Sequence, residues 1–196
     1  MKTVTYEEFL KFAPCWLKYE DGAERIKAYF DRFGGRMSAL DILTLDDVSA
    51  EDKLWSVLRE EFIPAPILHE FACVCAEYAL TLIDNPDPRS IKAVEVKRAW
   101  IRGEATDEEL ANARDAAIDA ACDTAIGSAL SAAMATVWVT RNAYRADWDA
   151  AWYAGEAAWE VVRDDARYDS DAACNAVCEA QVAYLIMTLE KEVCKQ

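Results

Sequence analysis

The feature that most constrains this chain is the absence of proline from its last 108 residues, which follow Pro88. Proline interrupts helices because it lacks an amide N–H and its ring clashes with the preceding turn. About a third of the residues from Ala111 to Ala183 are alanine, the strongest helix former. One helix of that length would outrun a globular domain, so we expect the segment to fold back on itself. Candidate turns lie near residues 127–128, 140–142 and 169–171.

Small residues recur at helical spacing in this part of the chain. Alanines stand four residues apart at Ala113, Ala117, Ala121 and Ala125, and again at Ala129 and Ala133. Positions four apart share one face of a helix, and a face of small side chains lets a neighbouring backbone approach closely. The pattern therefore favours closely packed helices.

Helix start signals recur through the rest of the chain, whereas strand signals are scarce. Two pairs have the spacing of a capping box, Thr5 with Glu8 and Thr106 with Glu109. Asp87 is a natural N-cap because Pro88 fits the first helical position. Apolar spacing and helix breakers predict helices over residues 5–12, 23–33, 49–62, 67–83 and 88–102, with another beginning at 106.

These signals predict an all-α fold, a single compact domain over residues 1–196 with about seven to nine helices. In this prediction residues 1–85 form an N-terminal helical subregion and residues 86–196 an alanine-rich helical bundle. A chain of this length buries a sizeable core without metal or disulfide staples.

The net charge excludes some classes of partner. The 36 acidic and 21 basic residues give a formal charge of −15. Duplex binding needs Lys and Arg against phosphates, and anionic membrane surfaces also attract basic segments. We therefore expect neither direct nucleic-acid binding nor membrane binding. The N-terminus has acids where a secretion signal needs apolar residues, and the seven cysteines do not suggest a secreted disulfide framework. We expect a cytoplasmic protein with reduced thiols.

Catalytic and metal-binding patterns are weak. His69 is the single histidine, which excludes any zinc site that needs two. Cys73 lies one helical turn after it, where a thiol can be lightly activated, but such a pair is more often a coincidence in a buried helix. The remaining cysteines favour core packing over a metal site. We expect no catalytic residues, no metal and no cofactor.

The most ordered pattern is aromatic. Tyr144, Trp148, Trp152 and Trp159 fall within a narrow arc of one helix, which predicts a core stripe. Carboxylates occupy the rest of the circumference, and we take them as a hypothetical partner-binding face: Asp147, Asp149, Glu156, Glu160, Asp164 and Asp165. Rigid rows of carboxylates complement a basic partner and accelerate encounter. The alternative is the solvated back of a core helix.

A second candidate surface is a basic island within one predicted helix. It comprises Arg89, Lys92, Lys97, Arg98 and Arg102, with Glu95 as the one acid among them. A solvated face that offsets nearby acids accounts for the same pattern.

The central segment resembles the type-five-like family of immunity proteins. The resemblance rests on residues 71–77 (Phe-Ala-Cys-Val-Cys-Ala-Glu), on Asn-Pro-Asp-Pro-Arg at 85–89 and on residues 93–104, which include Arg-Ala-Trp-Ile-Arg-Gly-Glu. Ala-Arg-Asp-Ala-Ala at 113–117 is similar to a repeat of the family, and residues 9–16 are similar to phage and gut-bacterial members. The match covers roughly residues 67–165 and lacks the histidines that many members carry in later helices.

This resemblance implies a non-enzymatic antidote that silences a toxin or another protein effector, and it brings no catalytic residues. Together with the acidity it leads us to expect an inhibitor that acts by stoichiometric protein–protein binding. The partner would be a toxin or a bacterial defence nuclease, the latter inhibited as anti-CRISPR proteins do, with a basic surface. The alternative function is an all-helical Mg²⁺-dependent nucleotide hydrolase, whose thermal stability would respond to EDTA or Mg²⁺.

Overall fold

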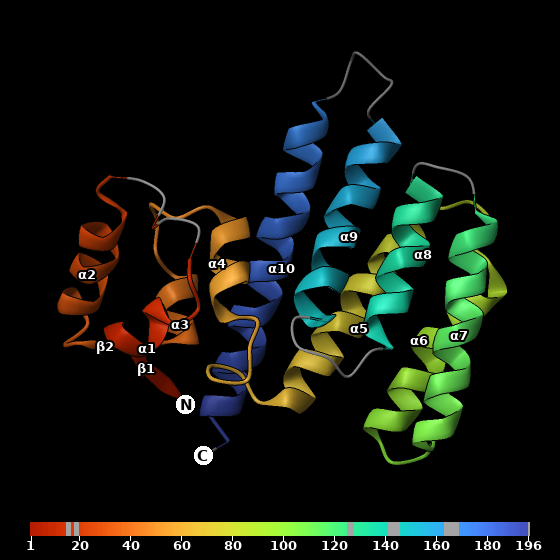
Figure 1. The fold of residues 1–196 in the computed structure, drawn as a ribbon, viewed down its shortest axis with the longest axis horizontal. Coiled ribbons are helices and arrows are strands. Elements are labelled where there is room, and N and C mark those ends of the chain that lie inside the picture. The colour runs from red at the N-terminus through yellow and green to blue at the C-terminus, as the bar shows by residue number, and fades with distance from the viewer. Residues whose placement is uncertain (15–16, 18–19, 125–127, 141–145, 163–168, 196) are drawn as a thin grey trace.

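The protein is an all-α single domain in the computed structural model, which describes every residue except 15–16, 18–19, 125–127, 141–145, 163–168 and 196. The described part contains ten helices and two short strands (Figure 1). The elements are β1 (Thr3–Thr5), α1 (Tyr6–Leu10), α2 (Gly22–Arg32), β2 (Arg36–Ser38), α3 (Ala39–Leu43), α4 (Ala50–Val57), α5 (Ala65–Thr81), α6 (Pro88–Ile101), α7 (Asp107–Asp123), α8 (Ser128–Val139), α9 (Ala146–Val162) and α10 (Ser170–Val193).

The last six helices form an array in which consecutive helices run in opposite directions (Figure 1). α9 packs against α5, α8 and α10, and α8 packs against α5, α6 and α7. The helices are separate at the three places where turns were predicted, since α7 ends at 123, α8 spans 128–139, α9 spans 146–162 and α10 begins at 170. The predicted turn residues 127 and 141–142 lie outside the described residues. Of the helices in the described part, α10 is the one long and apolar enough to cross a membrane, a test that core helices also pass.

The predicted start signals have the expected geometry. Both capping boxes are formed at the N-termini of α1 and α7. Asp87 caps α6 by accepting a hydrogen bond from the Arg89 backbone N–H, with Pro88 in the first turn. Gly34 and Gly35 have φ of 72° and 87° just beyond α2, which is the left-handed backbone that glycine tolerates at a helix end.

The N-terminal part differs from the prediction in three details. β1 and β2 pair antiparallel, with Val4 opposite Met37. α3 begins at a third capping box, which Ser38 forms with Asp41. α4 ends at Val57 instead of continuing to residue 62. These short elements explain why the described helices outnumber the predicted seven to nine.

The two halves of the molecule fill the core with different side chains. Near the N-terminus the buried residues include Phe9, Phe30 and Phe62, whose rings contact one another or Phe12. In α7, α8 and α9 most buried residues are alanine. Leu185 and Leu189 of α10 belong to the same continuous core as the phenylalanines, so α10 joins the array to the N-terminal elements.

Candidate functional site

The buried side of α9 is made of alanine. Ala150, Ala151, Ala154 and Ala157 are buried, whereas Trp152 is 39% exposed. The prediction that the tryptophan arc forms the core is therefore wrong for Trp152. The side chains of Tyr144, Trp148 and Trp159 lie outside the described residues.

Close packing of the helices explains why alanine, and not tryptophan, forms the buried side of α9. α8 and α9 make the most extensive contact between any two elements of the described structure, and α9 also packs on α5 and α10. A helix in contact with three neighbours has room for methyl groups on its inner side, so the large indole of Trp152 is displaced outward. The sequence carries a signal for this, because Ala150 and Ala154 repeat the four-residue spacing already noted in the preceding helices.

The carboxylates of α9 share the outward side with Trp152. Residues 152 and 156 are one turn apart, so Glu156 lies next to the indole along the helix. Asp149, Glu156 and Glu160 are all partly exposed. The sequence prediction had placed Glu156 and Glu160 away from the aromatic stripe, and the exposure of Trp152 corrects it. The Asp147 side chain, Asp164 and Asp165 lie outside the described residues.

The surroundings of Glu156 change the pKa of its carboxyl group. Partial burial raises the pKa of Glu156 above its usual range, and the neighbouring Glu160 carboxylate raises it further. A positive charge near Glu156 would oppose both effects and favour its charged form. The outward side of α9 thus combines an exposed indole with a carboxylate that a cation would stabilise.

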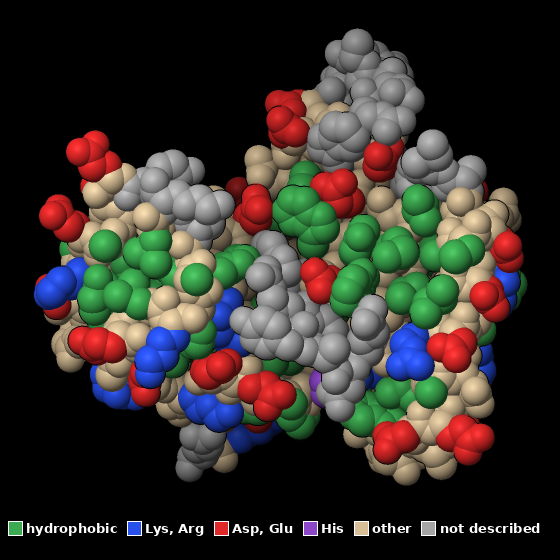
Figure 2. Space-filling view, viewed as in Figure 1, with side chains coloured by type: hydrophobic (Ala, Val, Ile, Leu, Met, Phe, Trp, Pro, Cys, Tyr) green, Lys and Arg blue, Asp and Glu red, His purple; other side chains and the backbone are tan. Residues whose placement is uncertain are grey.

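The surrounding surface has the same mixed character. On the face shown in Figure 2, hydrophobic side chains gather over α8 and α9 and between α8 and α7, with carboxylates among and around them. Met134 and Trp138 of α8 are partly exposed. This combination of apolar and acidic groups is typical of a protein-binding face, which needs aromatic anchors within a polar rim.

The basic island on α6 is largely the face that offsets nearby acids, with Lys92 and Arg102 exposed, and the one residue that departs from that prediction is the buried Lys97. Lys92 pairs with Glu95, and Arg102 pairs with Glu104. Arg98 makes a two-pronged ion pair with Glu77 and also bonds Glu70, so it joins α6 to α5. These basic groups are engaged within the molecule, which weakens the case for the second candidate surface.

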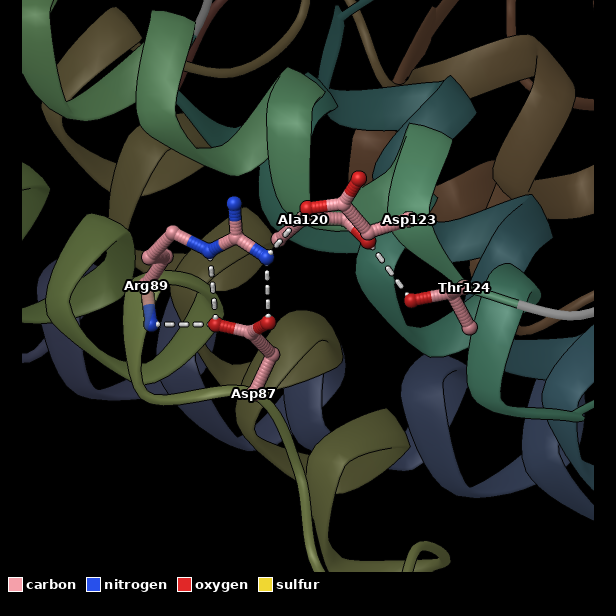
Figure 3. Close-up of polar contacts among 5 residues, drawn as sticks. All are labelled: Asp87, Arg89, Ala120, Asp123 and Thr124. Atoms are coloured by element: carbon pink, nitrogen blue, oxygen red, sulfur yellow. Dashed lines mark hydrogen bonds and ion pairs between the residues drawn. The ribbon is translucent and has the colours of Figure 1, made fainter.

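Arg89 makes the most elaborate of these contacts (Figure 3). Its guanidinium donates to both carboxylate oxygens of Asp87, at 3.0 and 2.7 Å, and its Nη2 also donates to Asp123 at 2.9 Å. Beside this contact the Thr124 hydroxyl donates to the Ala120 carbonyl at 2.6 Å. Arg89 therefore ties the N-terminus of α6 to the C-terminus of α7, and hydrogen bonds from Arg89 lower the pKa of Asp87.

Lys97 is completely buried. Its Nζ lies 4.3 Å from the centre of the Trp100 ring, a cation–π contact. The Trp100 ring in turn meets the His69 ring of α5 edge-on at 5.5 Å. Lys97 is thus part of the α5–α6 interface and is not available to a partner on the surface.

The thiols show no activated nucleophile next to His69. Burial raises the pKa of Cys73 to about 12, the opposite of the direction that nucleophilic chemistry needs. Cys73 and Cys75 are buried, as predicted, whereas Cys122 and Cys194 are exposed and correct the core assignment for those two. All six described cysteines are free.

The last thiol pair lies on α10. Cys174 and Cys178 share a face and are hydrogen-bonded, which lowers the pKa of Cys174 and raises that of Cys178. Cys174 also lies against α9, because a Cβ at Gly155 would stand 3.0 Å from its Sγ. Within the described ranges no three His, Cys, Asp or Glu side chains converge to hold a metal ion.

Comparisons with family models, with curated proteins and with solved structures return no match to this chain.

Proposed function

We propose that the protein is a non-enzymatic acidic inhibitor that binds a basic protein effector stoichiometrically through the outward side of α9. The observation that carries this proposal is the exposure of Trp152 beside Glu156 on a rigid helix. The effector would be a toxin that the protein neutralises or a bacterial defence nuclease that it inhibits, as anti-CRISPR proteins do. Both versions place the protein in the cytoplasm and require no cofactor.

The chemistry of the surface supports a basic partner. An exposed indole is the side chain most often found as an energetic anchor in interfaces. The adjacent Glu156 carboxylate is destabilised by partial burial and by Glu160. An incoming Lys or Arg would stack on the indole and neutralise the Glu156 carboxylate at the same time.

The overall charge supports the same conclusion. The cations of α6 are paired or buried, and the chain has 15 more acidic than basic residues. The excess carboxylates create a negative field around the molecule, which attracts basic proteins before contact. We therefore expect the interaction to depend on salt mainly through the association rate.

A matched set of variants tests the proposal. Wild-type protein is used to capture a basic partner from bacterial lysate, and the purified pair is measured by surface plasmon resonance. Trp152→Ala and Glu156→Lys should each weaken binding by about tenfold or more. Ile118→Ala and Asp119→Lys are the controls, because both residues are on α7, with Ile118 as exposed as Trp152 and Asp119 exposed as well.

Functional inhibition is then measured with the same partner. The effector should lose its activity at a 1:1 ratio, and binding should weaken between about 50 and 300 mM salt through slower association. If the α9 variants bind and inhibit like the wild type while the α7 variants fail, the α9 surface is not the contact. A partner converted catalytically, at far less than one equivalent of this protein, would contradict the inhibitor function itself.

A further inference from the structure

A pocket of about 630 Å³ lies where the end of α5, the start of α6 and the middle of α8 meet. Buried residues line its inner end, namely Ser90 of α6 with Ala132 and Ala133 of α8. Its rim is exposed and includes Asp84 and Asn85 from the turn that joins α5 to α6. None of its described lining residues belongs to α9, so the pocket is separate from the α9 surface.

The inner end of the pocket holds a hydroxyl group that the chain leaves unsatisfied. Ser90 is 1% exposed, and its Oγ has no hydrogen-bond partner among the described residues. Other buried hydroxyls on the described helices donate to a carbonyl about one turn earlier, as Ser56 does to the Asp52 carbonyl at 2.8 Å and Thr136 does at 2.7 Å. An unpaired buried hydroxyl is costly, so this end of the pocket favours a ligand that brings a hydrogen-bonding group of its own.

The rim of the pocket is negatively charged. None of the described Lys or Arg side chains makes an ion pair with Asp84, and none of the described lining residues is basic. α5 also ends at this rim, and its last turn, whose carbonyls carry partial negative charge, contains no basic residue. The Asp87 carboxylate is already compensated, because Arg89 donates to both of its oxygens (Figure 3). The charge that remains beside Asp84 therefore favours a cation.

The rest of the lining is largely apolar. It consists of Leu80, Ile83, Pro86, Pro88, Ala132 and Ala133, with Thr124 as the polar exception. The Thr124 hydroxyl is engaged, because it donates to the Ala120 carbonyl (Figure 3). An apolar lining with a few polar groups that fix orientation is typical of a small-molecule site, and the volume is within the usual range for one.

We propose that this pocket binds a small primary amine that has an apolar body and a hydroxyl group at its far end. The ammonium group lies at the rim, beside Asp84 and the C-terminus of α5. The apolar body packs on the alanines of α8, and the hydroxyl group reaches the inner end and hydrogen-bonds to the Ser90 Oγ. Each of the two polar groups thus meets the part of the pocket that lacks a partner of that kind.

A free small molecule suits the pocket better than a side chain of a partner protein does. A Lys side chain would bring an ammonium group on an apolar stem, but it has no second polar group for Ser90. The buried inner end also lies below the exposed rim, where a protein surface would stop. Since the pocket includes neither Trp152 nor Glu156, this binding does not depend on the proposed function.

Titration of the full chain with tyramine, followed by amide chemical shifts in NMR, measures the binding and locates it. Tyramine has an ammonium group at one end and a hydroxyl group at the other, and we expect it to bind one site with a dissociation constant below about 1 mM. The largest shifts should lie around Asp84 and Ser90. Phenethylamine lacks the hydroxyl group and para-ethylphenol lacks the ammonium group, so each should bind about tenfold more weakly.

Two variants assign the two ends of the ligand. Ser90→Ala should weaken tyramine binding about tenfold and leave phenethylamine binding unchanged. It should melt no lower than the wild type, because it removes an unpaired buried hydroxyl group. Asp84→Asn should weaken both amines and leave para-ethylphenol unchanged. Asp119→Asn, which removes an exposed charge from α7, is the control and should bind tyramine like the wild type.

Three results would overturn the proposal. One is the absence of saturable shifts around the pocket at tyramine concentrations up to about 20 mM. Another is equal affinity for tyramine and phenethylamine, which would leave the Ser90 hydroxyl without a role in binding. The third is an equal loss of affinity in Asp119→Asn and Asp84→Asn, which would reduce the binding to general attraction of a cation by a chain of charge −15.

Discussion

The N-terminal elements and helices α7–α9 of the array bury their cores in different ways. Between β1 and α4 large side chains fill the interior, among them Phe9, Phe30 and Leu54, and Phe62 meets Phe9 edge-on at 6.5 Å. In α7, α8 and α9 alanine takes that place, and the large indole of Trp152 lies on the outside. Rings hold short, irregular elements together, whereas methyl groups let long helices lie close. The bulky Phe62 is therefore core in the first region, whereas the bulky Trp152 lies on the surface in the second.

The difference determines which substitutions each region tolerates. A core of rings fails when a ring is removed, because the remaining cavity cannot collapse fully. A core of methyl groups fails when a side chain is enlarged, because the helices must separate. The two regions share one continuous core through α10, so both kinds of damage are measured as loss of the same global stability.

Removal of a ring should have the largest effect. Phe62 is fully buried and contacts Phe9 and Phe12. We expect Phe62→Ala to lower the free energy of unfolding by about 3–5 kcal/mol, measured by urea denaturation. A loss below about 1 kcal/mol would mean that the N-terminal elements contribute little to the cooperative unit.

Enlargement of a methyl group in the array should have the next largest effect. Ala154 is completely buried on α9, which contacts α5, α8 and α10. Ala154→Leu should destabilise the protein by about 1–3 kcal/mol. The partly exposed Ala111→Leu on α7 is the control and should be nearly neutral. If Ala154→Leu is tolerated as well as the control, the helices are not in the close contact described.

The same comparison predicts a small stability effect at Trp152. Because its indole is 39% exposed, we expect Trp152→Ala to cost less than about 1 kcal/mol of folding free energy, the usual range for surface positions. Partner binding should nevertheless weaken by about tenfold or more. A large stability loss together with intact binding would restore the core role that the sequence pattern indicated.

The features of the fold that depend on residues close together in the chain could be predicted from the sequence. Capping boxes, Asp87 before Pro88 and the reversal at Asp169 all involve residues within a few positions of one another, so spacing alone was sufficient. Two tertiary outcomes were missed. Lys97 is charged and completely buried, and Trp152 is large, apolar and exposed. Both depend on how closely neighbouring helices pack, and aromatic periodicity by itself does not determine which side of a helix faces inward.

The smallest expected effect concerns the carboxylate beside Trp152. Partial burial, with the Glu160 charge as the second cause, raises the pKa of Glu156 above its ordinary value of 4.5. The folded protein therefore binds this proton more tightly than the unfolded chain does. The resulting stabilisation is present below pH 4.5 and is lost as the pH rises through the folded-state pKa, so at neutral pH the charged form disfavours folding.

Glu156→Gln removes that charge without changing the shape of the side chain. We expect the variant to be slightly more stable than the wild type at pH 7, and the difference should shrink toward zero at pH 4. Urea denaturation at both pH values measures it, with Asp119→Asn at an exposed site on α7 as the control. The same variant should bind the basic partner more weakly, because an amide offers no charge to neutralise. On the outward side of α9, the Glu156 carboxylate would then oppose folding and favour binding. On the opposite side of the helix, the buried alanines contribute to packing. If the substitution lowers stability at pH 7, the Glu156 charge is already compensated within the chain and the field at this surface is weaker than proposed.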